Sequence, residues 1–146
     1  MTRVMVDTNV FVSYLLRPGS NNAPNQVVNA AFARRFEMIL SETTLAELAR
    51  SVRDKPWLAA HIETGNMDAF TTELNQIAVI VPEVAESLPS VTRDPKDDYL
   101  IAHAVLENID YLVTGDKDLL VLKQIDTTRI VSPAEFVATL ETETGD

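Results

Sequence analysis

The chain has 146 residues, of which 46% are hydrophobic and 23% charged, a composition typical of one globular domain with a proper core. Its formal net charge of −10 argues against a module that binds nucleic acid nonspecifically by neutralising phosphates, but not against an enzyme whose carboxylates hold metal. The lack of cysteine excludes disulfides and thiolate metal sites and fits a cytoplasmic location, and no stretch resembles a membrane helix or a signal peptide.

The first sixteen residues predict a strand, an acid and a helix. Val4, Met5 and Val6 form a short apolar run that is typical of a buried strand. Asp7 follows directly, and the apolar run over residues 10–16 predicts a helix that packs back on the sheet. Ligands bind at the carboxyl end of the strands in open parallel α/β sheets, where Asp7 would lie. Asp7 can equally serve as a helix N-cap, because aspartate is favoured at that position.

The following segment continues the alternation of helices and strands. Residues 17–25 are dense in turn formers and predict a loop. Residues 27–32 have helical spacing, and residues 36–40 predict the second strand. An amphipathic helix is predicted over residues 41–53, with a buried stripe at spacings of three and four residues. Glu47 lies off the centre of that stripe, where a solvated surface role is usual for a glutamate.

Three acids crowd the middle of the chain. Before them, the pattern predicts two short helices, a third strand and a linker, over residues 57–62, 67–76, 77–81 and 82–89. Asp94, Asp97 and Asp98 then lie at the start of a predicted helix, with Asp98 in its first turn and the apolar run after Tyr99 on its buried side. Asp97 can serve as an N-cap, and acids in a first helical turn gain from the helix dipole. Three acids in five residues nevertheless exceed what capping requires.

The last third of the chain repeats the opening pattern. The fourth predicted strand, residues 111–114, is followed by Gly115 and then Asp116. A short helix, a fifth strand and a closing helix are predicted over residues 119–122, 128–131 and 132–140. The alternation predicts a three-layer α/β/α sandwich with a central, mostly parallel five-stranded sheet. We expect one domain over residues 1–140, with residues 141–146 as an acidic, frayed tail.

The acids are expected to converge at one edge of this sheet. Asp7 and Asp116 end two strands, Asp98 opens the helix before the second of them, and Glu47 lies on the helix after strand two. Four neighbouring carboxylates repel and raise one another's pKa unless a cation lies among them. All-oxygen ligation suits Mg²⁺ or Mn²⁺, which can orient water and stabilise the leaving oxygen of a phosphodiester. The chain carries neither a glycine-rich phosphate loop nor a defensible catalytic triad.

Four sequence pieces, in this order, resemble the PIN domain family and especially its VapC-like branch of bacterial toxins. The pieces extend over nearly the whole chain and are Val6-Asp7-Thr8-Asn9, residues 41–48 (Ser-Glu-Thr-Thr-Leu-Ala-Glu-Leu), residues 97–104 (Asp-Asp-Tyr-Leu-Ile-Ala-His-Ala) and residues 113–120 (Val-Thr-Gly-Asp-Lys-Asp-Leu-Leu). The resemblance implies a metal-dependent ribonuclease with a five-stranded parallel sheet between helices.

The resemblance also implies which residues hold the metal. The quartet would be Asp7, Glu47, Asp98 and Asp116, with Mg²⁺ or Mn²⁺ as the cofactor. Asp97 is the alternative to Asp98, because only one of two adjacent acids can point inwards. Asp98 is preferred, since it directly precedes the Tyr-Leu-Ile-Ala run as the acid of the family does.

Supporting residues and partners follow from the same resemblance. Asn9 would orient the first acid, Ser41 or Thr114 would support the ligands from behind, and Asp118 matches a further acid near the metal. Family members commonly form homodimers and are neutralised by a small antitoxin. The candidate RNA contacts are basic residues in or beside the motifs, which can alternatively just balance nearby acids: Arg17, Arg50, Arg53, Lys96 and Lys117.

Three other functions remain open at this point. A noncatalytic PIN-like interaction module would use the acids only for capping, and the net charge of −10 slightly favours it. An RNA-processing nuclease outside toxin systems would use the same residues. A metal phosphatase of small substrates would usually need a second acid two residues after Asp7, where this chain has Asn9.

Overall fold

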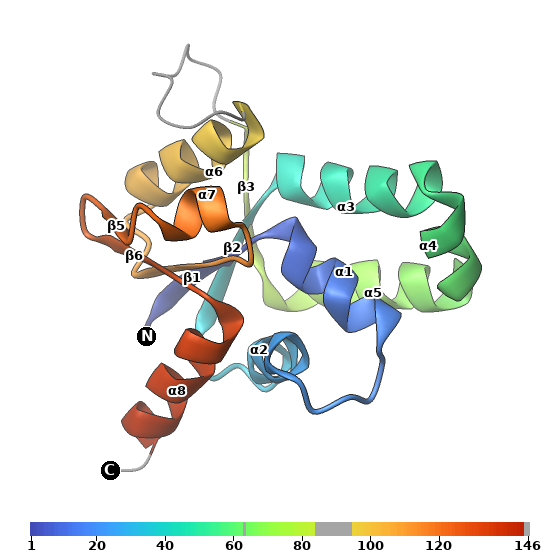
Figure 1. The fold of residues 1–146 in the computed structure, drawn as a ribbon, viewed down its shortest axis with the longest axis horizontal. Helices are drawn as coiled ribbons and strands as arrows, with labels where there is room; N and C mark the ends of the chain where they lie inside the picture. Colours follow the sequence, from blue (N-terminus) through green and yellow to red (C-terminus); the bar gives the residue numbers. More distant parts are fainter. Residues whose placement is uncertain (63, 84–94, 145–146) are drawn as a thin grey trace.

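A computed structural model describes the chain except for residues 63, 84–94 and 145–146 (Figure 1). It contains a six-stranded sheet in the order β3-β2-β1-β4-β6-β5. The strands are β1 (Arg3–Val6), β2 (Glu37–Ser41), β3 (Val79–Val81), β4 (Tyr111–Val113), β5 (Gln124–Ile125) and β6 (Thr128–Val131). All neighbouring strands are parallel except β5, which runs antiparallel to β6. The predicted parallel α/β sandwich is therefore confirmed, with β5 as an additional strand.

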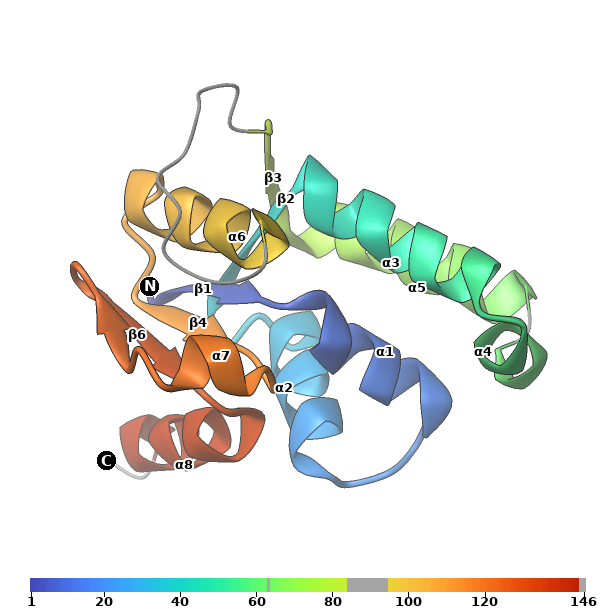
Figure 2. The ribbon, with the colours of Figure 1, turned by 45° about the horizontal axis from the view of Figure 1, so that its top comes forward.

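Helices cover both faces of the sheet. They are α1 (Thr8–Leu16), α2 (Ala23–Phe32), α3 (Glu42–Asp54), α4 (Pro56–His61), α5 (Thr64–Ile77), α6 (Pro95–Leu106), α7 (Lys117–Leu120) and α8 (Pro133–Thr144). Figure 2 shows α6 on one side of β1 and both α2 and α8 on the other. The α3, α4 and α5 helices, which connect β2 to β3, extend away from the sheet together (Figures 1 and 2). Within the described residues, none of these helices has the length and apolarity needed to cross a membrane.

Two hydrophobic cores form because successive side chains of a strand point to opposite faces. Val4 and Val6 of β1 belong to one core, together with apolar residues of α1 to α5 and α8. Met5, between them, belongs to the other core, which α6 and α7 complete with residues such as Leu100 and Leu119. The strand is thus buried on both faces, which explains why its sequence is an unbroken apolar run.

Several element boundaries differ from the sequence prediction, most clearly at α2, α6 and α8. The α6 helix begins at Pro95, so Asp97 lies inside it and is not its N-cap. The loop predicted over residues 17–25 ends earlier, because α2 begins at Ala23. The side chain of Asn22 caps this helix by accepting a hydrogen bond of 2.9 Å from the backbone N–H of Asn25. At the other end of the chain, α8 continues to Thr144 and so extends beyond residue 140. The linker predicted over residues 82–89 falls mostly outside the described residues, and Asp94 lies outside them entirely.

The strand order creates a switch point beside β1. The chain builds β1, β2 and β3 in one direction and then adds β4 and β6 on the opposite side of β1. The backbone N–H of Asp7 donates to the carbonyl of Val113 at 2.9 Å, which ties the carboxyl ends of β1 and β4 together. In open α/β sheets the crevice at such a point is the usual ligand site. The residues that follow β1 and β4 are therefore the expected place of a ligand site.

Candidate active site at the carboxyl edge of the sheet

A cavity of about 290 Å³ lies at this edge. Four acids from four separate parts of the fold contribute to its wall: one after β1, one on α3, one on α6 and one after β4. The lining residues are Asp7, Thr8, Asn9, Val12, Glu47, Arg50, Ser51, Lys55, Asp97 and Asp116. Three of the four acids expected to converge, Asp7, Glu47 and Asp116, thus line one cavity together with Asp97.

Asp7 is held by side chains from both strand ends. It occupies the N-cap position of α1, yet its side chain makes no capping hydrogen bond. Its Oδ2 instead accepts hydrogen bonds from the Thr114 hydroxyl at 2.7 Å and from the Asn9 side-chain amide at 3.2 Å. These bonds fix the carboxylate at the cavity wall. The side chain of Asp7 therefore does not cap α1, although the residue occupies the N-cap position.

The pKa of Asp7 is raised above its ordinary value of 3.8. Burial is the largest cause, because it disfavours the charged carboxylate, and the negative charge of Asp116 acts in the same direction. The hydrogen bonds from Thr114, the Thr8 backbone and Asn9 oppose the shift. A partly buried acid with a perturbed pKa in a cavity marks a candidate functional site.

Thr114 and Asn9 also position the turn that carries Asp116. The buried Thr114 hydroxyl accepts a hydrogen bond of 3.0 Å from the backbone N–H of Asp116. The side-chain oxygen of Asn9 accepts another, of 3.2 Å, from the backbone N–H of Gly115. Asp116 Oδ1 in turn accepts from the backbone N–H of Asp118 at 2.9 Å and caps α7. The two strand ends are therefore joined into one network around Asp7.

Glu47 reaches the cavity from α3. Its Oε2 accepts a hydrogen bond of 3.4 Å from the Thr8 hydroxyl, which belongs to the first residue of α1. Arg50 and Ser51, three and four residues later, line the same cavity, as expected for residues on one helical face. Glu47 is half-buried, so the surface role that is usual for a helical glutamate does not apply.

The two adjacent acids of α6 differ in position. Asp97 and Asp98 both lie in the first turn and are 7% and 9% exposed. Only Asp97 is among the residues that line the cavity. Consecutive residues point about 100° apart around a helix, so the two side chains cannot share one direction. Asp97 is therefore the acid of α6 that reaches the cavity, while the metal-binding role of either acid stays a prediction.

The remaining predicted residues that the structure describes do not line the cavity, although the Thr114 hydroxyl holds Asp7. The Ser41 hydroxyl caps α3 by accepting from the Thr44 backbone N–H at 3.1 Å, and Arg53 pairs with Asp54 at 3.4 Å. The predicted residues that are described but absent from the cavity lining are Arg17, Ser41, Arg53, Asp98, Thr114, Lys117 and Asp118. The side chain of Lys96 lies outside the described residues. Sequence reasoning missed Ser51 and Lys55, although both follow Glu47 at helical spacings of four and eight residues.

Replacing Ser41 separates capping from catalysis. We expect Ser41→Ala to lower the free energy of unfolding by about 1 kcal/mol, because α3 loses the acceptor for one N-terminal N–H. Urea denaturation measures this loss. The RNA cleavage that the sequence resemblance implies should be unchanged at a temperature well below the transition. A severe loss of cleavage in a fully folded variant would instead support the predicted role of Ser41 behind the metal ligands.

The donor set of the cavity fits a hard divalent cation in its chemistry. Its four acids offer only oxygen ligands, the type that Mg²⁺ and Mn²⁺ prefer, and a cation would offset the factors that raise the pKa of Asp7. In the part of the chain that the structure describes, no three acidic or histidine side chains are close enough to ligate one ion. Ligation would therefore require the carboxylates to turn towards a common point.

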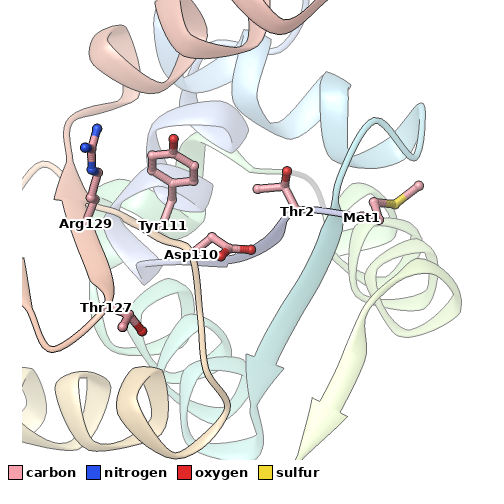
Figure 3. A pocket seen from close by; sticks show the side chains of 6 residues that line it. All are labelled: Met1, Thr2, Asp110, Tyr111, Thr127 and Arg129. Carbon is pink, nitrogen blue, oxygen red and sulfur yellow. The ribbon is translucent and has the colours of Figure 1, made fainter.

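A second cavity, of about 560 Å³, lies at the opposite, amino edge of the sheet (Figure 3). Its lining residues are Met1, Thr2, Asp110, Tyr111, Thr127 and Arg129. It has a single acid, Asp110, whose Oδ2 accepts from the Arg3 backbone N–H at 2.9 Å. This cavity contains none of the predicted site residues and does not reproduce the acidic chemistry of the first.

Comparisons with known proteins agree with the architecture. The chain is 26% identical over 148 aligned residues to the uncharacterized protein MJ1680 of Methanocaldococcus jannaschii, covering 95% of this chain and 92% of that protein. A family model described as PIN domain matches residues 3–118, a range that includes all four cavity acids. PIN domains are generally nucleases that act on RNA. The match extends over most of the chain, which therefore belongs to the PIN domain family.

Proposed function

We propose that this protein is a metal-dependent endoribonuclease that hydrolyses RNA phosphodiester bonds. Mg²⁺ or Mn²⁺ would be held by the four acids of the cavity, Asp7, Glu47, Asp97 and Asp116. The observation that carries the proposal is that four separate elements bring these acids to one cavity at the switch point of the sheet. The nuclease character of PIN domains supports the same chemistry.

The chain's own residues prepare the site for this reaction. The Thr114 hydroxyl and the Asn9 amide hold one oxygen of Asp7, and the Thr8 hydroxyl holds one oxygen of Glu47. These hydrogen bonds hold two of the four carboxylates at the cavity wall, from which they would turn towards a common ion. A bound divalent ion would supply positive charge that lowers the pKa of an attacking water and stabilises the leaving oxygen. No side-chain nucleophile is required.

We further propose that the nuclease is the toxin of a toxin–antitoxin pair. The resemblance of the four ordered sequence pieces to VapC-like toxins supports this role, together with a homodimeric state, a small antitoxin partner and a cytoplasmic location. A short neighbouring reading frame whose product binds the protein and blocks RNA cleavage would support the toxin role. If no such inhibitor exists and expression does not slow growth, RNA processing outside toxin systems becomes the better assignment.

A cleavage assay tests the proposed activity. The purified protein is incubated with structured and single-stranded RNAs in Mn²⁺, Mg²⁺ or EDTA. We expect cleavage with at least one metal, none in EDTA, and none with Glu47→Gln, which removes the charge but keeps the shape of the side chain. Cleavage that survives EDTA or this substitution would contradict the metal site. If no RNA is cut under any condition, the noncatalytic interaction module becomes the better interpretation.

A further inference from the structure

The cavity has a basic wall as well as an acidic one. Arg50 of α3 and Lys55, the residue directly after α3, line it together with Glu47. An α-helix rises about 1.5 Å per residue, so Arg50 starts about 4.5 Å beyond Glu47 along α3, and Lys55 follows the far end of that helix. Ser51 lies between them on the same wall. The two cations therefore form a row that leads away from the acids.

Both cations are available to a ligand. Within the described residues, neither Arg50 nor Lys55 forms an ion pair within 4 Å, and both are exposed. Arg53, on the same helix, instead pairs with Asp54 and does not line the cavity. Arg50 and Lys55 thus line the same cavity as its four described acids without forming ion pairs with them.

We propose that Arg50 and Lys55 bind RNA backbone phosphates that flank the scissile phosphate on one side. This inference rests on the proposed function and extends it by naming the residues that hold the polyanion. A chain with a net charge of −10 repels RNA overall, so local cations must offset that repulsion next to four acids. The guanidinium of Arg50 can donate two parallel hydrogen bonds to one phosphate, and Lys55 supplies a point charge further along.

The test measures binding separately from chemistry. A fluorescent single-stranded RNA is titrated in Mg²⁺ against Asp7→Asn protein, which is expected not to cut it, with and without further substitutions. We expect Arg50→Ala and Lys55→Ala each to weaken binding roughly tenfold, because each removes a charged contact to phosphate. Each should also reduce the slope of log K against log salt by about 0.7, the value for one phosphate contact on a single strand.

Arg53→Ala is the matched control, since it removes the same charge from the same helix outside the cavity. It should change binding less than twofold, and Lys55→Arg should retain the salt slope. In the active protein, Lys55→Ala should raise KM while kcat changes little, because the contact is distant from the reacting bond.

The outcomes separate this inference from the proposed function. If RNA is cut but Arg50→Ala and Lys55→Ala bind no worse than Arg53→Ala, the phosphate row is wrong and the nuclease stands. If no RNA is cut but Arg50→Ala and Lys55→Ala still bind RNA more weakly than Arg53→Ala, the proposed nuclease activity is wrong and the phosphate contacts of Arg50 and Lys55 are supported. If Asp7→Asn protein without further substitutions does not bind RNA detectably at low salt, the proposed phosphate contacts of Arg50 and Lys55 are also wrong.

Discussion

Asp7→Asn should abolish RNA cleavage and also raise the melting temperature of the metal-free protein. Cleavage should fall by on the order of 10³-fold or more, because the substitution removes a carboxylate that we propose as a metal ligand. The gain in stability follows from burial, since an ionised carboxylate in this position is partly desolvated and faces Asp116. Asparagine is neutral, and its side-chain oxygen can still accept the hydrogen bonds from Thr114 and Asn9.

The pH dependence of this effect has a definite sign. The pKa of Asp7 in the folded protein is raised above 3.8, so the folded state binds the proton more tightly than the unfolded state does. The stabilising contribution of protonated Asp7 is complete below pH 3.8 and is lost as the pH rises through the folded-state pKa. The advantage of Asp7→Asn should therefore grow over this range and then stay constant towards neutral pH.

Thermal melting in EDTA across a pH series measures this difference. Asp118→Asn is a suitable control, because it also removes one negative charge but its exposed side chain does not line the cavity. Addition of Mn²⁺ should raise the melting temperature of the unsubstituted protein more than that of Asp7→Asn, since a ligand that binds the folded state stabilises it. A variant that melts lower at neutral pH, or that still cuts RNA, would contradict this account.

The positions of Asp7 and Asp116 could be predicted because the relevant signal is local. Each follows a short, wholly apolar run, and such runs are buried strands in a sheet covered on both faces. Parallel strands place their carboxyl ends at the same edge, so the convergence of the two acids needs only that β1 and β4 be neighbours. The two-residue β5 strand is too short to leave any comparable pattern, and it was missed.

The choice between Asp97 and Asp98 could not be made from sequence because it depends on tertiary packing. Both acids suit the first turn of α6, and both are buried. Which of them faces the cavity depends on how α6 rotates when Leu100, Ile101 and Ala104 pack on the sheet. The place of Lys55 in the cavity wall could not be predicted either, because a lysine at a helix end next to proline indicates only a boundary.

Asp97→Asn should reduce RNA cleavage by about 100-fold or more, whereas Asp98→Asn should leave it within a few-fold of the unsubstituted protein. The expected contrast follows from the cavity, which Asp97 lines together with Asp7, Glu47 and Asp116, and which Asp98 does not line. The pair is well matched, since both substitutions remove one carboxylate from the same helical turn and both positions are nearly equally buried.

Two measurements distinguish a lost metal ligand from a damaged fold. Values of kcat/KM for one RNA give the loss of transition-state stabilisation, and melting curves with and without Mn²⁺ report metal binding independently of cleavage. Asp97→Asn should remain folded in EDTA but gain less stability from Mn²⁺, while Asp98→Asn should respond as the unsubstituted protein does. The reverse ranking would assign the metal-binding acid of α6 to Asp98 and would mean that α6 rotates when the ion binds. Equal losses in both variants without a change in the Mn²⁺ response would indicate that the first turn of α6 serves the fold rather than the metal.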